Sequence, residues 1–185
     1  MTNTNKGLII AAIIIILLAK PKKAKAESLL TMKTSKAENL IKFYEESNIV
    51  KLKAYLDPVN IYTIGWGNTF NYTKNRPVQK DDVITKQEAQ LFFDIHMQGI
   101  IAGLKKLLKV NINENQFNAL LSWVYNFNLQ KLATSTLLKL LNRGASKELV
   151  ANEFLKWNKG RVKGKLVVLP GLVTRRRAEA DLFLS

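Results

Sequence analysis

The spacing of apolar residues predicts a helix followed by a short β-region in the first part of the chain. Apolar side chains recur at the helical period from Ser35 to Glu46, and Ser35 with Glu38 forms a capping-box signature, so a helix is predicted over that range. The segment from Leu52 to Thr69 is rich in Tyr, Ile, Thr and Trp and is interrupted by Asp-Pro, Asn and Gly. This composition predicts a hairpin or small sheet, and no other segment favours β-structure as clearly.

The chain after residue 85 is predicted to be mainly helical. Thr85 with Glu88 and Asn113 with Gln116 form two further capping boxes, each ahead of a run with helical periodicity. The other predicted helices are Ser135–Leu141, Lys147–Trp157 and a last one that Thr174 caps and that ends at Leu182 and Phe183. The basic, Val-rich segment between them, Gly160–Gly171, is predicted to be a connection.

An apolar run stands apart at the N-terminus. Gly7 to Leu18 is uninterrupted, is shorter than the roughly 20 residues that cross a bilayer squarely, and fits the core of a signal peptide. Ala24-Lys25-Ala26 offers a cleavage site, whereas the lysines from Lys20 to Lys25 disfavour export of that flank. Residues 1–26 are therefore assigned to a signal peptide or an uncleaved N-terminal membrane anchor, with a buried core helix as a third interpretation. Residues 27–185 are assigned to one globular domain, exported or membrane-anchored, that acts outside the cytoplasmic membrane.

The composition restricts the chemistry and the partners. With no cysteine and a single histidine, His96, neither a thiolate site nor an imidazole zinc site is expected, and catalysis would use carboxylates or hydroxyls. The formal net charge of +15 indicates an anionic partner: nucleic acid, anionic lipid or a wall polymer. Because no basic stripe interleaved with aromatics and no nucleic-acid module appears, an anionic wall or membrane surface is expected and nucleic acid is not.

The first helix and the hairpin carry candidate groups for cleaving a glycosidic bond. That reaction needs a proton donor and a second carboxylate that attacks or orients water. A helix ending in Glu45 and Glu46, followed by a hairpin with Asp57 and Thr63, could place such groups across a cleft. Carboxylates at a helix end are usually solvated, however, so these residues alone do not decide the function.

The sequence around these residues resembles a known catalytic signature. LIKFYEE and LKAYLDPVNIYTIGWGNT resemble the segments of phage-type lysozymes (endolysins, glycoside hydrolase family 24, the muramidases similar to the T-even phage lysozymes) in which a helix ends in aromatic-Glu-Gly and AY-x-D-P-x-G leads into T-x-G-x-G-x-T. Further similar blocks lie at residues 82–89, 116–128, 135–144 and 171–183. The resemblance covers about residues 35–185.

This resemblance implies a fold and an activity. The fold is α+β and lysozyme-like, with a small lobe that holds a short antiparallel sheet, a larger helical lobe, and a glycan groove between them. The activity is hydrolysis of the β-1,4 bond between N-acetylmuramic acid and N-acetylglucosamine in peptidoglycan, without metal or organic cofactor, by a monomer. Its biological use is phage-mediated wall degradation during lysis or entry, the latter from a virion-associated protein.

The resemblance also implies roles for individual residues. Glu45 matches the general acid, Asp57 the facing carboxylate, and Thr63 the hydroxyl that helps to hold the water. The implied substrate-binding residues are Gly65, Asn68 and Asn126. Three features depart from the family: the spacing from Glu45 to Asp57 is longer, Glu46 stands where Gly is usual, and Asn68 stands where His is usual. Glu46 is therefore the alternative catalytic acid.

Three other functions compete with hydrolysis. A lytic transglycosylase acts on the same substrate but needs no water-orienting carboxylate, so the presence of Asp57 and Thr63 favours hydrolysis. The unusual spacing also fits an inactive wall-binding or virion structural protein. Charge and anchor alone would fit a membrane-bound nucleic-acid protein.

Several further residues are predicted to have structural roles. Trp66, Trp123 and Trp157 are expected in the core, because aromatics at helical spacing usually pack. The triplet Arg175–Arg177 is expected to divide between one structural ion pair and a solvated face. Asn60 and Asn128 stand at turn positions where the family has glycine, which asparagine tolerates because it adopts left-handed conformations more readily than most residues.

Overall fold

The computed structural model describes residues 32–57 and 60–185, apart from positions 47–48 and 163. Thr34–Ser185 form one compact unit. The predictions made for residues 1–26 lie outside the described residues. Within the described part of the chain, no helix has the length and apolar character needed to cross a membrane.

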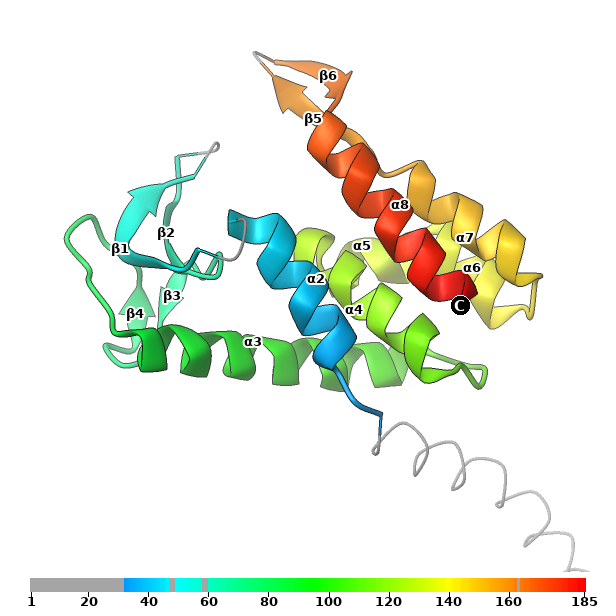
Figure 1. The fold of residues 1–185 in the computed structure, drawn as a ribbon, viewed down its shortest axis with the longest axis horizontal. Helices are drawn as coiled ribbons and strands as arrows, with labels where there is room; N and C mark the ends of the chain where they lie inside the picture. Colours follow the sequence, from blue (N-terminus) through cyan, green and yellow to red (C-terminus); the bar gives the residue numbers. More distant parts are fainter. Residues whose placement is uncertain (1–31, 47–48, 58–59, 163) are drawn as a thin grey trace, which may run out of the picture. The chain divides into compact units, whose positions relative to one another are not determined.

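The described elements form the predicted α+β architecture (Figure 1). The helices are α2 (Ser35–Glu46), α3 (Lys86–Leu107), α4 (Glu114–Phe127), α5 (Leu129–Thr134), α6 (Thr136–Asn142), α7 (Lys147–Leu155) and α8 (Pro170–Leu184). The strands are β1 (Lys51–Leu56), β2 (Tyr62–Gly65), β3 (Phe70–Asn71), β4 (Arg76–Pro77), β5 (Lys159–Val162) and β6 (Lys165–Val168), paired as three antiparallel two-stranded sheets.

The two longest helices begin where the sequence predicts. Thr85 precedes α3 and accepts from the N–H of Glu88, whose side chain accepts in return from the N–H of Thr85. Asn113 and Gln116 form the same reciprocal pair at the start of α4. These bonds satisfy N–H groups that have no partner within a helix. Helix α2 spans the predicted range Ser35–Glu46, but its capping contact differs from the prediction: Thr34, not Ser35, donates its hydroxyl to Glu38.

The small lobe is built on the β1–β2 pair, in which Tyr55 lies opposite Thr63. Its buried cluster joins both sheets of this lobe to the first turns of α3: Ile64, Val78, Ile84, Ala89 and Phe92. Asp82 fixes the connection before α3, since its buried carboxylate accepts from Lys74 at 2.6 Å and from Arg76 at 2.7 Å. Helix α3 runs from this lobe into the helical lobe (Figure 1).

The helical lobe is organised around α4, which packs against α2, α3, α5 and α8. Trp123 of α4 is fully buried, and its ring meets the rings of Phe127 and Trp157 at 4.8 Å between centroids. Trp66 is also buried, so the prediction that tryptophans serve the core is confirmed for these two, while Trp157 is partly exposed.

Two sequence-based boundaries in the C-terminal part are wrong. The predicted connection holds the β5–β6 hairpin, whose turn uses Gly164 at a φ of +80°. Both strands are largely exposed, so the usual apolar-in, polar-out alternation is missing from their sequence. Helix α8 begins at Pro170, because proline fits the first helical turn, and Thr174 lies inside the helix, where it bonds to the carbonyl of Pro170.

Candidate active site

Glu45, in the last turn of α2, points its carboxylate at two other parts of the chain. One oxygen, Oε1, accepts from Nη1 of Arg175 at 2.8 Å. The other, Oε2, lies 3.4 Å from where a Cβ would stand on Gly67, in the turn after β2. The side chain keeps 22% of its surface exposed, whereas Arg175 keeps 4%. An accessible carboxylate thus rests on a buried cation, and it adjoins a backbone position that has no side chain.

The cation behind Glu45 is held by a buried network. Arg175 donates from Nε to Oε1 of Glu179 at 3.3 Å and from Nη2 to the carbonyl of Ser122 at 3.3 Å. The same Glu179 oxygen also accepts from the hydroxyl of Ser122 at 2.7 Å and from Nη2 of Arg176 at 2.7 Å. Arg176 in turn lies over the ring of Phe127, 4.9 Å from its centroid. This network fixes the guanidinium from its buried side.

Asp57 and Thr63 both bond to Ile61, at the turn between β1 and β2. The carboxylate of Asp57 accepts from the N–H of Ile61 at 2.8 Å, and the backbone N–H of Asp57 donates to the carbonyl of Ile61 at 3.0 Å. Thr63 donates its hydroxyl to that same carbonyl at 3.1 Å. Asn60 supports the turn with a φ of 62°, which confirms that asparagine fills this left-handed position. Both side chains are therefore anchored through Ile61.

Two of the predicted substrate residues, at the end of β2 and in the turn after it, are packed against α3. Gly65, at a φ of +66°, is buried, and a Cβ there would stand 3.6 Å from Ala89 of α3. Asn68 is 5% exposed, and its amide donates to the carbonyl of Phe92 at 3.4 Å. These contacts pack the turn against α3, so a direct contact of Gly65 or Asn68 with substrate stays a prediction.

Tyr125 connects this turn to α4. Its hydroxyl donates to the carbonyl of Trp66 at 2.5 Å. Burial raises the pKa of Tyr125 well above its usual range, so the hydroxyl keeps the proton that it donates. The turn that carries Gly67 is therefore tied to the helical lobe beside Glu45.

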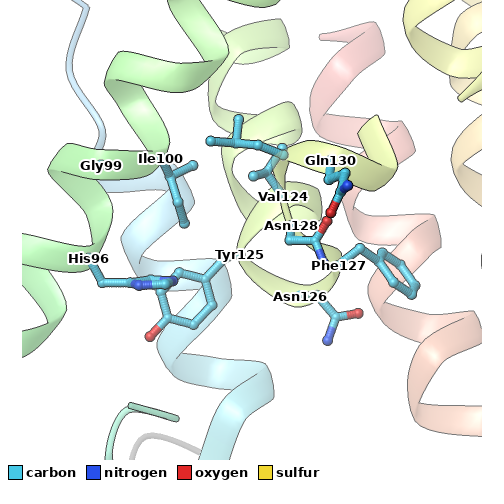
Figure 2. Close-up of a pocket in the computed structure, with 10 residues that line it drawn as sticks. His96, Gly99, Ile100, Val124, Tyr125, Asn126, Phe127, Asn128 and Gln130 are labelled. Carbon is cyan, nitrogen blue, oxygen red and sulfur yellow. The ribbon is translucent and has the colours of Figure 1, made fainter. Parts of the chain in front are cut away.

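A cavity of about 570 Å³ opens beside Tyr125, lined by residues of α3, α4 and α5 (Figure 2). Asn126 borders it, and Oδ1 of this residue is buried without a hydrogen-bond donor among the described residues. His96 lies on the opposite wall, with its ring 5.1 Å from that of Tyr125. Partial desolvation lowers the pKa of His96. The volume falls in the range of ordinary ligand pockets.

The structure assembles part of the predicted site and adds residues to it. It joins both Asp57 and Thr63 to Ile61, and it brings Glu45 to the turn after β2; Glu46 is the last residue of α2. The predicted set lacks Arg175 and Glu179. Two of the three consecutive arginines are buried in ion pairs rather than one, and only Arg177 is exposed. One sequence pattern could have revealed this ion-pair network. Two arginines stand three and four residues before Glu179, and this spacing puts all three side chains on one side of a helix.

Comparisons with known proteins agree on one family. Residues 45–179 match the profile described as Phage lysozyme. The endolysin of Acyrthosiphon pisum secondary endosymbiont phage 1 is 40% identical over 79% of this chain and 93% of its own length. The solved endolysin of Escherichia coli O157:H7 phage FAHEc1 has a TM-score of 0.73 and 36% identity, over 83% of this chain and 94% of that one.

Two further relatives differ from these endolysins, one in its length and the other in its name. The endolysin of Bacillus phage B103 is 40% identical over 80% of this chain, which spans 52% of that protein. A protein of Bacteriophage PS119 named SAR-endolysin is 28% identical over 73% of this chain and 75% of its own length.

Proposed function

The chain belongs to the phage lysozyme family, and from that membership we propose that it is a muramidase that hydrolyses the β-1,4 bond between N-acetylmuramic acid and N-acetylglucosamine. The observation that carries the proposal is the placement of Glu45. This accessible carboxylate is held from behind by the buried Arg175, and its other oxygen adjoins the side-chain-free Gly67. Arg175 holds Oε1 and so fixes the carboxylate, which leaves Oε2, on the side of Gly67, as the oxygen positioned to deliver a proton to a leaving sugar oxygen.

In the proposed mechanism, Glu45 protonates the glycosidic oxygen as the bond to the anomeric carbon breaks. Asp57 stabilises the positive charge that develops on the sugar and, together with Thr63, orients the attacking water. Because the Thr63 hydroxyl donates to the carbonyl of Ile61, its oxygen is left to act toward a water as an acceptor. The water transfers a proton to the Asp57 carboxylate as its oxygen bonds to the anomeric carbon, and the new hydroxyl forms on the face opposite the departing sugar.

The cavity beside Tyr125 is the proposed site for part of the glycan. Asn126 lines this cavity, and its amide side chain can hydrogen-bond the acetamido group that both sugars of peptidoglycan carry. The wall of this cavity is mostly apolar and aromatic, with a few polar groups, as is usual for sites that fix the orientation of a small ligand. Asn126 is therefore proposed to contact substrate.

The place of action is proposed to lie outside the cytoplasmic membrane. Peptidoglycan is found there, and the similarity to proteins named SAR-endolysin supports an N-terminal export signal or signal-anchor. Residues 1–26 are proposed to be that signal or anchor, with the remainder as the catalytic domain. The net charge of +15 would hold the enzyme on an anionic wall or membrane surface. The catalytic domain is proposed to act as a monomer.

Digestion of purified sacculi followed by mass spectrometry of the products tests this function. Hydrolysis yields reducing ends, a lytic transglycosylase yields anhydro ends, and an inactive wall-binding protein yields no soluble fragments. Reducing ends are expected because Asp57 and Thr63 provide for an attacking water. Anhydro ends, or no cleavage, would overturn the proposal.

Two matched substitutions identify the acid. Glutamine keeps the size of the side chain but cannot supply the proton, and general acid catalysis contributes about 10² to 10⁴-fold. Glu45→Gln is expected to lose at least that much activity at an unchanged melting temperature, whereas Glu46→Gln should keep most of it. The reverse ranking would give the role to Glu46, and small losses in both would refute the assignment.

A further inference from the structure

We propose that Glu179, a fully buried residue that no substrate can touch, is a positioning residue for the catalytic acid. It acts through Arg175 and is balanced by Arg176. This inference rests on the proposed function of Glu45. It adds a group of charged residues that sets both the position of that acid and the net charge behind it. The group is a series of alternating charges that leads from the groove into the core: Glu45, Arg175, Glu179 and Arg176.

The geometry makes Glu179 the centre of this series. A single oxygen, Oε1, accepts from Nε of Arg175, Nη2 of Arg176 and the hydroxyl of Ser122. Because Arg175 is held at Nε by Glu179 and at Nη2 by the Ser122 carbonyl, its Nη1 is left in one orientation, 2.8 Å from Glu45. Without Glu179, the guanidinium would lose one of these two anchors.

The network is not optimised for stability. Oε2 of Glu179 and both Nε and Nη1 of Arg176 have no hydrogen-bond partner among the described residues, although all three atoms are buried. Buried ion pairs of this kind can often be replaced by apolar side chains at no cost in stability. A stability role alone therefore accounts poorly for three fully or nearly fully buried charges directly behind the acid.

The charges of the series balance. Arg176 remains a cation at neutral pH, since desolvation lowers its pKa only to about 10. Burial raises the pKa of Glu179, and the two guanidiniums and the Ser122 hydroxyl act against that rise. With two cationic donors on one oxygen, the pocket stabilises the carboxylate form. Glu179 thus offsets one of the two positive charges that would otherwise act on Glu45.

Other titratable groups also face Glu45. His96 of α3 and Tyr125 of α4 both interact with its charge, and Tyr44 on α2 lies under the guanidinium of Arg175. All three stay in place in the variants below. Shifts measured against the wild-type pH profile therefore report the change in the buried charges.

The test uses the full chain and follows kcat and KM on purified peptidoglycan across pH. Glu179→Gln leaves a surplus positive charge behind Glu45, which favours loss of its proton. The alkaline limb of the kcat profile should therefore move to lower pH by about half a unit to one unit. Loosening of Arg175 should lower kcat by about tenfold or more, and KM should change by less than about twofold because Glu179 is buried away from substrate.

The reciprocal variant has the opposite sign. Arg176→Gln leaves a surplus negative charge, so its alkaline limb should move to higher pH. The double variant Glu179→Gln with Arg176→Gln restores the balance and should return the limb toward the wild-type position. Glu153→Gln, which removes another buried glutamate on α7, is the matched control and should leave the limb unchanged.

The outcomes separate this inference from the proposed function. If the wild-type chain cleaves peptidoglycan but Glu179→Gln moves the limb no more than Glu153→Gln does, the positioning role is overturned. Shifts of the same sign in Glu179→Gln and Arg176→Gln would also overturn it, since general structural damage has no charge sign. If circular dichroism shows that a single variant does not fold, the balanced double variant still tests the inference. An alkaline limb of its kcat profile that is displaced from the wild-type position would refute the charge balance.

Discussion

A methyl group added at Gly67 would stand beside the oxygen that is proposed to donate the proton. Gly67→Ala places a Cβ 3.4 Å from Oε2 of Glu45, which is close to van der Waals contact. The methyl would therefore not displace Glu45 far, but it would fill the space through which the leaving sugar oxygen must approach. Because misplacement of a reacting group by about 1 Å can cost about 100-fold in rate, we expect kcat to fall by roughly tenfold to 100-fold.

The backbone contributes a second, separable effect. Gly67 has a φ of +92°, where an L-residue costs about 1 to 2 kcal/mol. For a domain of this size that corresponds to a fall of about 2–4 °C in melting temperature per kcal/mol. Gly144 has a φ of +73° and nothing within 4 Å of its added Cβ, so Gly144→Ala carries a similar strain without a neighbour in the active site.

The assay compares both variants by thermal melting and by initial rates on purified peptidoglycan. Both should melt a few degrees lower than wild type, and only Gly67→Ala should lose kcat at a temperature where both are folded. Equal rates in the two variants would refute the reasoning, because the methyl at position 67 would then not reach the reaction.

Three further predictions concern stability, stereochemistry and the N-terminus. The Arg76 hydrogen bond, with help from Lys74, holds the pKa of Asp82 well below its usual range, so Asp82→Asn should lower the free energy of unfolding at pH 7 by about 1–3 kcal/mol. Denaturant titrations should show this difference in the free energy of unfolding shrinking as the pH falls below about 4. A carboxylate with a depressed pKa stabilises the folded state above its unfolded pKa and loses that effect in acid. A difference that stays constant with pH would argue against the ion pairs. If Asp57 and Thr63 orient water, NMR of the first-formed product should show the α-anomer, and a β-anomer would make Asp57 a nucleophile. Deleting residues 1–26 should leave the specific activity on purified peptidoglycan intact, because Thr34–Ser185 form a compact unit, and a large loss would show that the segment contributes to the enzyme.

Interactions that are local in sequence could be predicted from the sequence. The capping boxes of Thr85 and Asn113 join residues three positions apart, so their signature is legible without knowledge of the fold, and both helices begin there. The positive φ of Asn128, 101°, was expected on a different ground, because the family that the sequence resembles has glycine at this turn.

Interactions between distant segments could not be predicted in this way. Glu45 and Arg175 meet only because α2 and α8 both pack on α4, and no local pattern encodes that meeting. The β5–β6 hairpin was missed for a different reason: Val and Lys occur on both of its exposed faces, so the usual alternation of a half-buried strand is absent. Resemblance to a family supplied the candidate catalytic residues, but not the buried charges behind Glu45.

The long separation between Glu45 and its partner affects when the enzyme becomes active during its synthesis. Arg175 follows Glu45 by 130 residues, so the ribosome has already made Glu45, Asp57 and Thr63 when the codon for Arg175 is still to be read. A nascent chain interrupted before that codon contains Glu45, Asp57 and Thr63 but not the cation that pairs with Glu45, the proposed acid. Truncated translation products are therefore expected to be inactive. Only chains whose last helix has left the ribosome and packed on α4 are expected to have activity.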